Sequence, residues 1–186
     1  MLVLAAAACT ALILGAAPPA GAAPTAGSAQ ISVPAPPGGV NVKGLYSGVS
    51  LGVADHEIAA ARQLHARVVR AELRWSTLEP LAASQIDPHA VAFTDRLVAD
   101  AAAAGIRVIF TVDSTPCWAS SAPAALLRKC LPGGLTRAAN AWPPRNPADY
   151  AAAVAFIARR YGTQLAAIEV WNEPDQANQL YFAGPK

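Results

Sequence analysis

Glu173 is the residue of this chain best suited to proton transfer at a binding site. An apolar run at 165–171 has the length of a buried strand, and Asn172, Glu173 and Pro174 follow it directly. Proline stops regular strand pairing and fixes the chain direction just after the glutamate. Glu173 is therefore expected at the rim of the sheet, where the strand ends. A carboxyl group there, partly shielded from water, can protonate a leaving group, and Asn172 can donate to a hydroxyl group. The alternative interpretation is a solvated acidic turn.

Asp113 ends a second apolar run, at 106–112, and is expected to face the same site. It can bind a ligand or simply cap the following loop. That loop is long, reaching residue 145, and contains Trp118 and Trp142. For both indoles the alternative to ligand binding is packing inside the loop. The three histidines do not have metal-ligand spacing, so we expect no metal site and treat them as structural or surface residues.

The elements that must position these residues alternate between strand and helix. Strand-like runs lie at 46–53, 68–75, 106–112 and 165–171. Helical patterns lie between them; Asp55 is expected to cap the first, while Asp87 and Asn146, each followed by proline, begin the others. This order predicts an α/β fold of parallel strands joined by right-handed helical crossovers.

Four βα units correspond to half of a (β/α)8 barrel, the TIM barrel, which typically takes about 250 residues. Long loops after the strands are where barrel enzymes build their sites, which fits the loop at 113–145. A doubly wound sheet is the structural alternative. Such a sheet usually has a glycine-rich phosphate turn after its first strand, and the turn at 52–56 has no such fingerprint.

The N-terminal segments are expected to lie outside this fold. Residues 1–22 combine an apolar run with a small-residue cleavage pattern, which predicts a secretory signal peptide. Residues 23–44 are rich in proline, glycine and alanine and predict a flexible linker, so the folded part of the chain is expected at 45–186. The apolar run is shorter than the roughly 20 residues of a membrane span, so we expect no stable membrane association after signal removal.

Charge and cysteine content narrow the function classes further. The formal net charge is +2 with no run of Lys or Arg, which argues against a nucleic-acid partner. Removal of the signal leaves Cys117 and Cys130. Two cysteines in an exported chain suggest one disulfide that closes a local loop, with two free thiols as the alternative.

The segment Trp171-Asn172-Glu173-Pro174-Asp175 resembles the acid/base motif of clan A glycoside hydrolases. Its continuation through residues 180–184 is most similar to family 39, with family 5 as a close alternative. The resemblance extends from residue 46 to the end of the chain. It implies a (β/α)8 barrel that hydrolyses glycosides with retention, with Glu173 as general acid/base and Asn172 at the sugar 2-hydroxyl.

Two earlier segments carry the same resemblance. The run Val-Val-Arg-Ala-Glu-Leu-Arg-Trp at 68–75 is similar to the second strand of these enzymes, which implies that Arg70 helps to keep the nucleophile charged. A buried arginine needs an anionic partner in any case, so a structural salt bridge is the alternative, and Arg74 could exchange roles with Arg70. The segment at 105–119 is similar to the third strand and its loop, which makes Trp118 a candidate sugar platform and Trp142 a weaker one.

A retaining mechanism needs two carboxylates about 5 to 5.5 Å apart. In the resembled clan the nucleophile comes from strand seven, and no residue of this chain matches it. We therefore expect the first four βα units of a secreted β-glycan hydrolase without metal or organic cofactor. Two alternatives stay open: a half-barrel that pairs with itself, with Asp113 in place of the nucleophile, and a carbohydrate-binding remnant that uses Trp118 without hydrolysis.

Overall fold

A computed structural model of the chain describes residues 38–46, 50–130, 137–175 and 182–184. All of them belong to one compact unit, Ala35–Lys186. The predicted signal peptide at 1–22 and residues 23–37 of the predicted linker lie outside the described residues. The signal peptide therefore remains a prediction.

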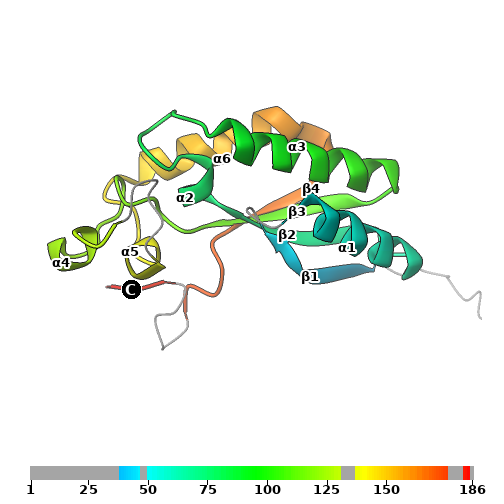
Figure 1. Ribbon diagram of the computed structural model, residues 1–186, viewed down its shortest axis with the longest axis horizontal. Coiled ribbons are helices and arrows are strands. Elements are labelled where there is room, and N and C mark those ends of the chain that lie inside the picture. Colours follow the sequence, from blue (N-terminus) through cyan, green and yellow to red (C-terminus); the bar gives the residue numbers. More distant parts are fainter. Residues whose placement is uncertain (1–37, 47–49, 131–136, 176–181, 185–186) are drawn as a thin grey trace, which may run out of the picture. The chain divides into compact units, whose positions relative to one another are not determined.

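Four parallel strands form a single sheet in the order β1-β2-β3-β4. They are β1 (Gly39–Tyr46), β2 (Val68–Arg74), β3 (Arg107–Asp113) and β4 (Leu165–Val170). The central register places Ala71 beside Phe110 and Phe110 beside Ile168. Because all four strands run the same way, their carboxyl ends meet at one edge of the sheet (Figure 1).

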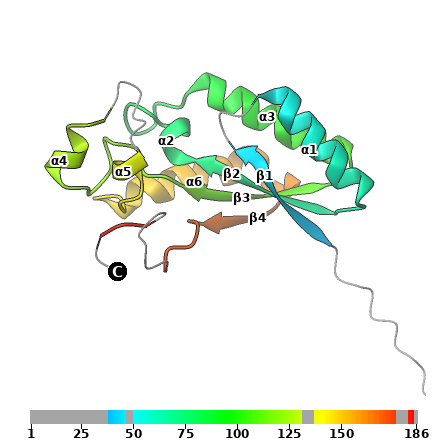
Figure 2. The ribbon, with the colours of Figure 1, turned by 60° about the horizontal axis from the view of Figure 1, so that its bottom comes forward.

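Three long helices connect the strands: α1 (Leu51–Gln63), α3 (Pro88–Ala103) and α6 (Pro147–Tyr161). They lie on the same side of the sheet (Figures 1 and 2). Short helices follow the strands: α2 (Trp75–Leu78) after β2, and α4 (Ala124–Leu127) and α5 (Arg137–Asn140) after β3. A 3-10 turn at Gly162–Gln164 joins α6 to β4.

The core forms where the helices cover the sheet. Alternate residues of β2 and β3 are buried there together with the apolar stripes of the three long helices. The members of this core are Ala54, Ile58, Ala61, Val69, Ala71, Leu73, Leu97, Val98, Ala101, Val108, Phe110, Val112, Ala153 and Ile157. Strand alternation sends the intervening residues to the opposite face, which therefore holds the polar side chains of the sheet.

The two proline-marked helix starts are confirmed. The Asp87 carboxylate accepts from the backbone N–H of His89 at 2.7 Å and of Ala90 at 3.2 Å. The Asn146 side chain accepts from the backbone N–H of Ala148 at 3.1 Å. Each cap satisfies donors that a helix cannot satisfy itself, so these two residues set where α3 and α6 begin.

The prediction for the first βα unit is wrong in its position along the sequence. The first strand is Gly39–Tyr46 rather than 46–53, so it begins inside the segment predicted as linker. The first helix begins at Leu51, capped by Ser50 and not by Asp55. Two glycines in the strand obscure its apolar alternation, but pairing with β2 satisfies its backbone and lets Val40 and Val42 pack against the core.

The long loop after β3 is held by its own hydrogen bonds. Ser120 forms an isolated antiparallel bridge with Pro144, and its hydroxyl donates to the carbonyl of Ala139 at 2.7 Å. The predicted disulfide between Cys117 and Cys130 is present, with a Cα–Cα distance of 6.2 Å. The described parts of the loop, 114–130 and 137–145, therefore form a cross-linked, folded region at the carboxyl end of β3.

The predicted α/β class with parallel strands is confirmed, whereas closure into a barrel remains a prediction. Across the ranges that the structure describes, we found no helix with the length and apolar character that a membrane crossing requires.

Candidate active site

The face of the sheet opposite the helices carries a row of charged and polar side chains. On β2 and β3 they alternate with the apolar core residues, and on β4 the pairing of Thr111 with Glu169 places Glu169 on the same face. These side chains are Arg70, Glu72, Arg74, Thr111, Asp113 and Glu169. Register places Glu72, Thr111 and Glu169 side by side, and Arg74 beside Asp113. The strands thus gather two cations and three carboxylates on one surface near their carboxyl ends.

Arg70 links β2 to β4 across this surface. Its Nε donates to Glu169 Oε2 at 2.6 Å, and its Nη2 donates to Asn172 Oδ1 at 2.8 Å. Thr111 on β3, between the two strands, donates to the same Glu169 oxygen at 2.5 Å. Burial by itself would raise the pKa of Glu169, but the hydrogen bonds from Arg70 and Thr111 outweigh it and lower that pKa below its ordinary value.

Asp113 is a buried carboxyl group at the end of β3, with only 5% of the residue exposed. Burial raises its pKa from 3.8 to about 7, and the nearby Glu72 charge acts in the same direction; a Ser114 hydrogen bond and the charges of Arg74 and Arg70 oppose the shift. Among the described residues, its Oδ1 has no hydrogen-bond partner. A buried polar atom of this kind at a strand end is suited to meeting a ligand.

The turn after β4 has unusual backbone geometry. Trp171 has φ +67° and Glu173 has φ +42°, both in the left-handed region that side chains other than glycine rarely adopt. Trp171 is buried, and its N–H donates to the carbonyl of Val112 at 2.9 Å. Glu173 is exposed and Asn172 is half-buried. The turn therefore buries the tryptophan and presents the two polar residues at the rim.

A row of aromatic rings packs at the carboxyl ends of the strands and includes the tryptophan of this turn. Trp118 contacts Trp75 edge-on at 5.6 Å, and Trp75 contacts Tyr150 at 5.5 Å between ring centroids. Tyr150 lies 6.0 Å from Trp171, which meets Phe182 edge-on at 5.4 Å. Edge-to-face pairs at these separations are favourable beyond simple burial. The row joins residues that follow β2, β3 and β4.

Both candidate tryptophans have packing roles. The Trp118 indole N–H donates to the carbonyl of Glu79 at 2.8 Å, and its backbone carbonyl accepts from Arg145. The ring of Trp142 lies so close to Gly184 that an added Cβ there would approach it to 2.7 Å. Each indole is nevertheless only half-buried, so part of each remains accessible.

The structure brings some of the predicted site residues into contact and leaves others apart. Arg70 bonds Asn172 directly, and Asp113 lies within electrostatic reach of Arg70. Glu173 follows Asn172 in the chain but, at its exposed position, lacks the partial shielding expected from the sequence. Glu169 was not predicted as a site residue from the sequence. The available signal was a single carboxylate inside the apolar run at 165–171, which needs a partner such as Arg70.

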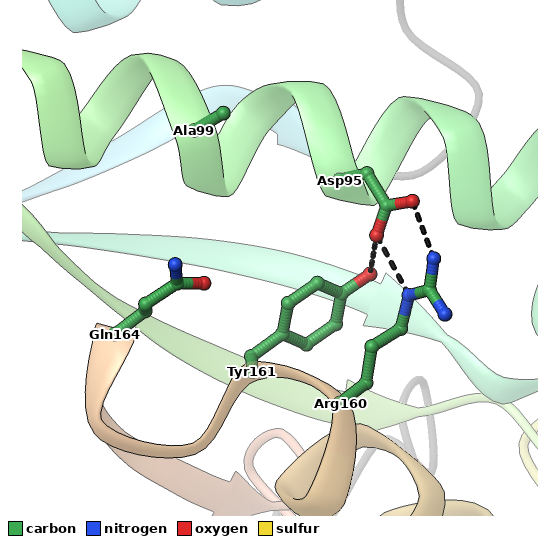
Figure 3. A pocket seen from close by; sticks show the side chains of 5 residues that line it. All are labelled: Asp95, Ala99, Arg160, Tyr161 and Gln164. Carbon is green, nitrogen blue, oxygen red and sulfur yellow. Dashed lines mark hydrogen bonds and ion pairs between the residues drawn. The ribbon is translucent and has the colours of Figure 1, made fainter.

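A separate pocket lies between α3 and the end of α6, away from the carboxyl ends of the strands (Figure 3). It measures about 310 Å³ and is lined by Asp95, Ala99, Arg160, Tyr161 and Gln164. Arg160 donates to Asp95 at 2.7 and 2.6 Å, and the Tyr161 hydroxyl donates to Asp95 at 3.1 Å, so the charged groups satisfy one another. Gln164 directly precedes β4, which places the pocket toward the amino end of that strand.

No group of three or more His, Cys, Asp or Glu side chains with the geometry to hold a metal ion occurs in the described ranges. The carboxyl, amide and guanidinium groups of this site can form hydrogen bonds, and its carboxyl groups can transfer protons.

Two solved structures are similar to this chain. One is a family 39 glycoside hydrolase from the gut symbiont Bacteroides cellulosilyticus WH2, with TM-score 0.49 and 19% sequence identity over 74% of this chain and 24% of that chain. The other is a GH5_18 from Bifidobacterium longum subsp. infantis, with TM-score 0.40 and 16% identity over 68% of this chain and 31% of that chain. Families 39 and 5 are also the two families that the segment at 171–184 resembles in sequence. No protein-family model and no curated protein sequence matches the chain.

This chain spans about a quarter of the first structure's length and about a third of the second's, as the coverages of 24% and 31% indicate.

Replacing Tyr150 by phenylalanine tests the support beneath the turn. Its hydroxyl donates to the carbonyl of Val112 at 2.7 Å, so Tyr150→Phe should lower the free energy of unfolding by about 0.5 to 1.5 kcal/mol. Tyr150→Ala, which also removes both ring contacts, should cost roughly 3 kcal/mol. Denaturant unfolding measures both. Tyr161→Phe is the matched control. It removes a hydroxyl that donates to the exposed Asp95, which stays paired with Arg160, so the loss of unfolding free energy should be smaller.

Asp113 predicts a pH dependence of stability. Its pKa is raised to about 7 in the folded chain, so between about pH 4 and pH 7 the unfolded chain releases a proton that the folded chain keeps. The free energy of unfolding should therefore fall as pH rises through this window. Asn does not titrate, so Asp113→Asn should gain stability relative to the parent with rising pH, by at most roughly 4 kcal/mol for the full shift.

Unfolding curves of parent and Asp113→Asn at a series of pH values measure this difference. Asp95→Asn is the control of opposite sign, because the hydrogen bonds with Arg160 and Tyr161 hold the pKa of Asp95 below its ordinary value. A difference between parent and Asp113→Asn that stays constant from pH 4 to pH 8 would contradict the buried, neutral carboxyl.

Proposed function

We propose that this chain forms part of a retaining O-glycoside hydrolase that acts on β-linked oligo- or polysaccharide. The observation that carries the proposal is the placement of Asn172 and Glu173. The motif that resembles the clan A acid/base segment follows the carboxyl end of a parallel strand, with the Asn172 amide bonded to Arg70 from the second strand.

In the proposed reaction Glu173 acts twice. As an acid it protonates the departing glycosidic oxygen while a nucleophilic carboxylate bonds to the anomeric carbon, forming a covalent glycosyl-enzyme. As a base it then takes a proton from the water that releases the sugar, and it is ready for the next cycle. Residues outside this chain supply the nucleophile, from the strand that completes the proposed (β/α)8 barrel.

The remaining site residues bind and orient the sugar in this proposal. Asn172 donates to the 2-hydroxyl beside the reacting carbon, and Arg70 supports it. Asp113 offers its free oxygen to a substrate hydroxyl, and its neutral form, favoured below about pH 7, can donate as well as accept. Trp118 and Trp142 provide the exposed parts of their rings for stacking against sugar rings. None of these roles requires a metal or an organic cofactor.

The proposed location is extracellular. The apolar segment at 1–22 supports export, and the disulfide between Cys117 and Cys130 is of the kind that persists in oxidising compartments. The folded unit would then follow a short linker and meet its polysaccharide outside the cell.

The decisive experiment compares leaving groups. In the protein as its source cell produces it, Glu173→Gln should slow hydrolysis of glycosides with poor leaving groups by about 10²- to 10⁴-fold, because these need a proton in the transition state. Activated aryl glycosides, whose leaving groups need no acid, should lose far less in the step that forms the glycosyl-enzyme. Initial rates over a series of phenols measure the contrast.

Asp175→Asn is the matched control, since it removes an exposed carboxylate two residues away and should leave the leaving-group dependence as in the parent. Equal losses of Glu173→Gln on all leaving groups would contradict the acid/base role. Sugar binding without turnover in the parent, unchanged by Glu173→Gln, would identify a binding protein instead. Loss of all activity in Asp113→Ala together with a stable dimer would favour the self-paired half-barrel.

A further inference from the structure

Asn172 is held by a chain of contacts that begins on the neighbouring strands. Thr111 and Arg70 both donate to one oxygen of Glu169, at 2.5 and 2.6 Å, and Arg70 then donates to Asn172 Oδ1 at 2.8 Å. These residues come from β3, β2 and β4 and from the turn after β4. We propose that Glu169 is a positioning residue that acts through Arg70 to fix the direction of the Asn172 side-chain amide. This inference rests on the proposed glycosidase function.

The chemistry of the guanidinium group determines which amide atom faces it. Arginine carries only donors, so the atom of Asn172 that meets Nη2 must be the acceptor Oδ1. The amide nitrogen Nδ2 then lies on the side of the carboxamide group away from the oxygen that Arg70 binds. A donor aimed out of the rim is what recognition of a sugar hydroxyl requires, whereas the flipped amide would offer an acceptor there.

Arg70 cannot hold this geometry by itself. Its side chain must reach over β3 to touch β4, across two strand spacings of about 4.8 Å each. A long side chain has many rotamers, and ordering it carries an entropic cost. The guanidinium fork is planar and rigid, so once Glu169 binds Nε the direction of Nη2 toward Asn172 is fixed as well.

Glu169 is suited to this task by its charge and by its second contact. The Glu169 carboxylate balances the positive charge of Arg70, and charge-assisted hydrogen bonds are roughly twice as strong as neutral ones. The Thr111 hydroxyl, on a fully buried residue of the central strand, restrains the carboxylate from the side. Exposed fractions of 27% for the Arg70 side chain and 45% for that of Glu169 mean that the pair contributes little to stability, so its value lies in orientation.

The test uses three variants of the protein as its source cell produces it. Glu169→Ala removes the anchor, Glu169→Gln keeps its shape and one acceptor without charge, and Glu72→Gln is the matched control. Glu72 lies on the same face and accepts from Arg74 at 2.6 Å, not from Arg70 in any contact seen here. Two properties are measured for each: the side-chain amide NMR signals of Asn172, assigned with Asn172→Asp, and kcat and KM on an aryl glycoside.

The Asn172 amide signals should move in Glu169→Ala, move less in Glu169→Gln, and stay at the parent positions in Glu72→Gln. In Glu169→Ala, kcat should fall by about 10- to 100-fold with little change in KM, because a misdirected group loses most in the transition state. Glu169→Gln should recover part of that loss. Parent-like Asn172 signals in Glu169→Ala, or equal shifts in Glu169→Ala and Glu72→Gln, would overturn the inference.

The NMR measurement separates this inference from the proposed function. If the parent hydrolyses no glycoside, the proposed function fails, and the Asn172 signals still decide whether Glu169 positions the amide. If the parent is active and the signals do not respond to Glu169→Ala, the function stands and the positioning role is overturned.

Discussion

The arrangement of this site depends on one constraint: charged side chains on one face of the sheet must be satisfied without the apolar cover that the other face has. Helices α1, α3 and α6 bury alternate residues of β2 and β3, and the period of two in a strand sends Arg70, Thr111 and Glu169 to the opposite face. There the arginine is paired with the carboxylate at 2.6 Å and shares it with the threonine hydroxyl. The same hydrophobic burial that forms the core therefore also brings together the groups that hold Asn172.

The aromatic row complements this polar network. Trp75 contacts Tyr150, and Tyr150 contacts Trp171, so the rings form a row at the ends of β2 and β4. This packing lets a strained turn bury its own tryptophan. Strain of this kind costs of order 1 to 3 kcal/mol and persists only where the surroundings determine it, and it concentrates at functional positions. Here its consequence is that Asn172 and Glu173 emerge at the rim while the residue before them is anchored in the interior.

Asp113 and Glu169 show how neighbouring carboxyl groups acquire different properties. Both lie on one face of the sheet, but Asp113 is buried beside Glu72 and its pKa rises to about 7, whereas the pKa of Glu169 is lowered by its donors. Environments that separate the pKa values of nearby carboxyl groups are typical of acid/base chemistry. In the proposed enzyme they separate a neutral group that can exchange hydrogen bonds with a sugar from a charged group that anchors an arginine.

The sequence by itself determined the elements whose signals are local. The caps at Asp87 and Asn146, the apolar runs of β2, β3 and β4 and the disulfide could all be predicted, because short-range hydrogen bonds, periodicity and residue chemistry fix them. Only the tertiary structure decided the position of β1. Its two glycines weaken the alternation of apolar and polar residues, so the strand is defined by its hydrogen bonds with β2. The tertiary structure alone also decided that Glu169 meets Arg70, since strand register and the reach of a side chain over β3 join residues 99 positions apart.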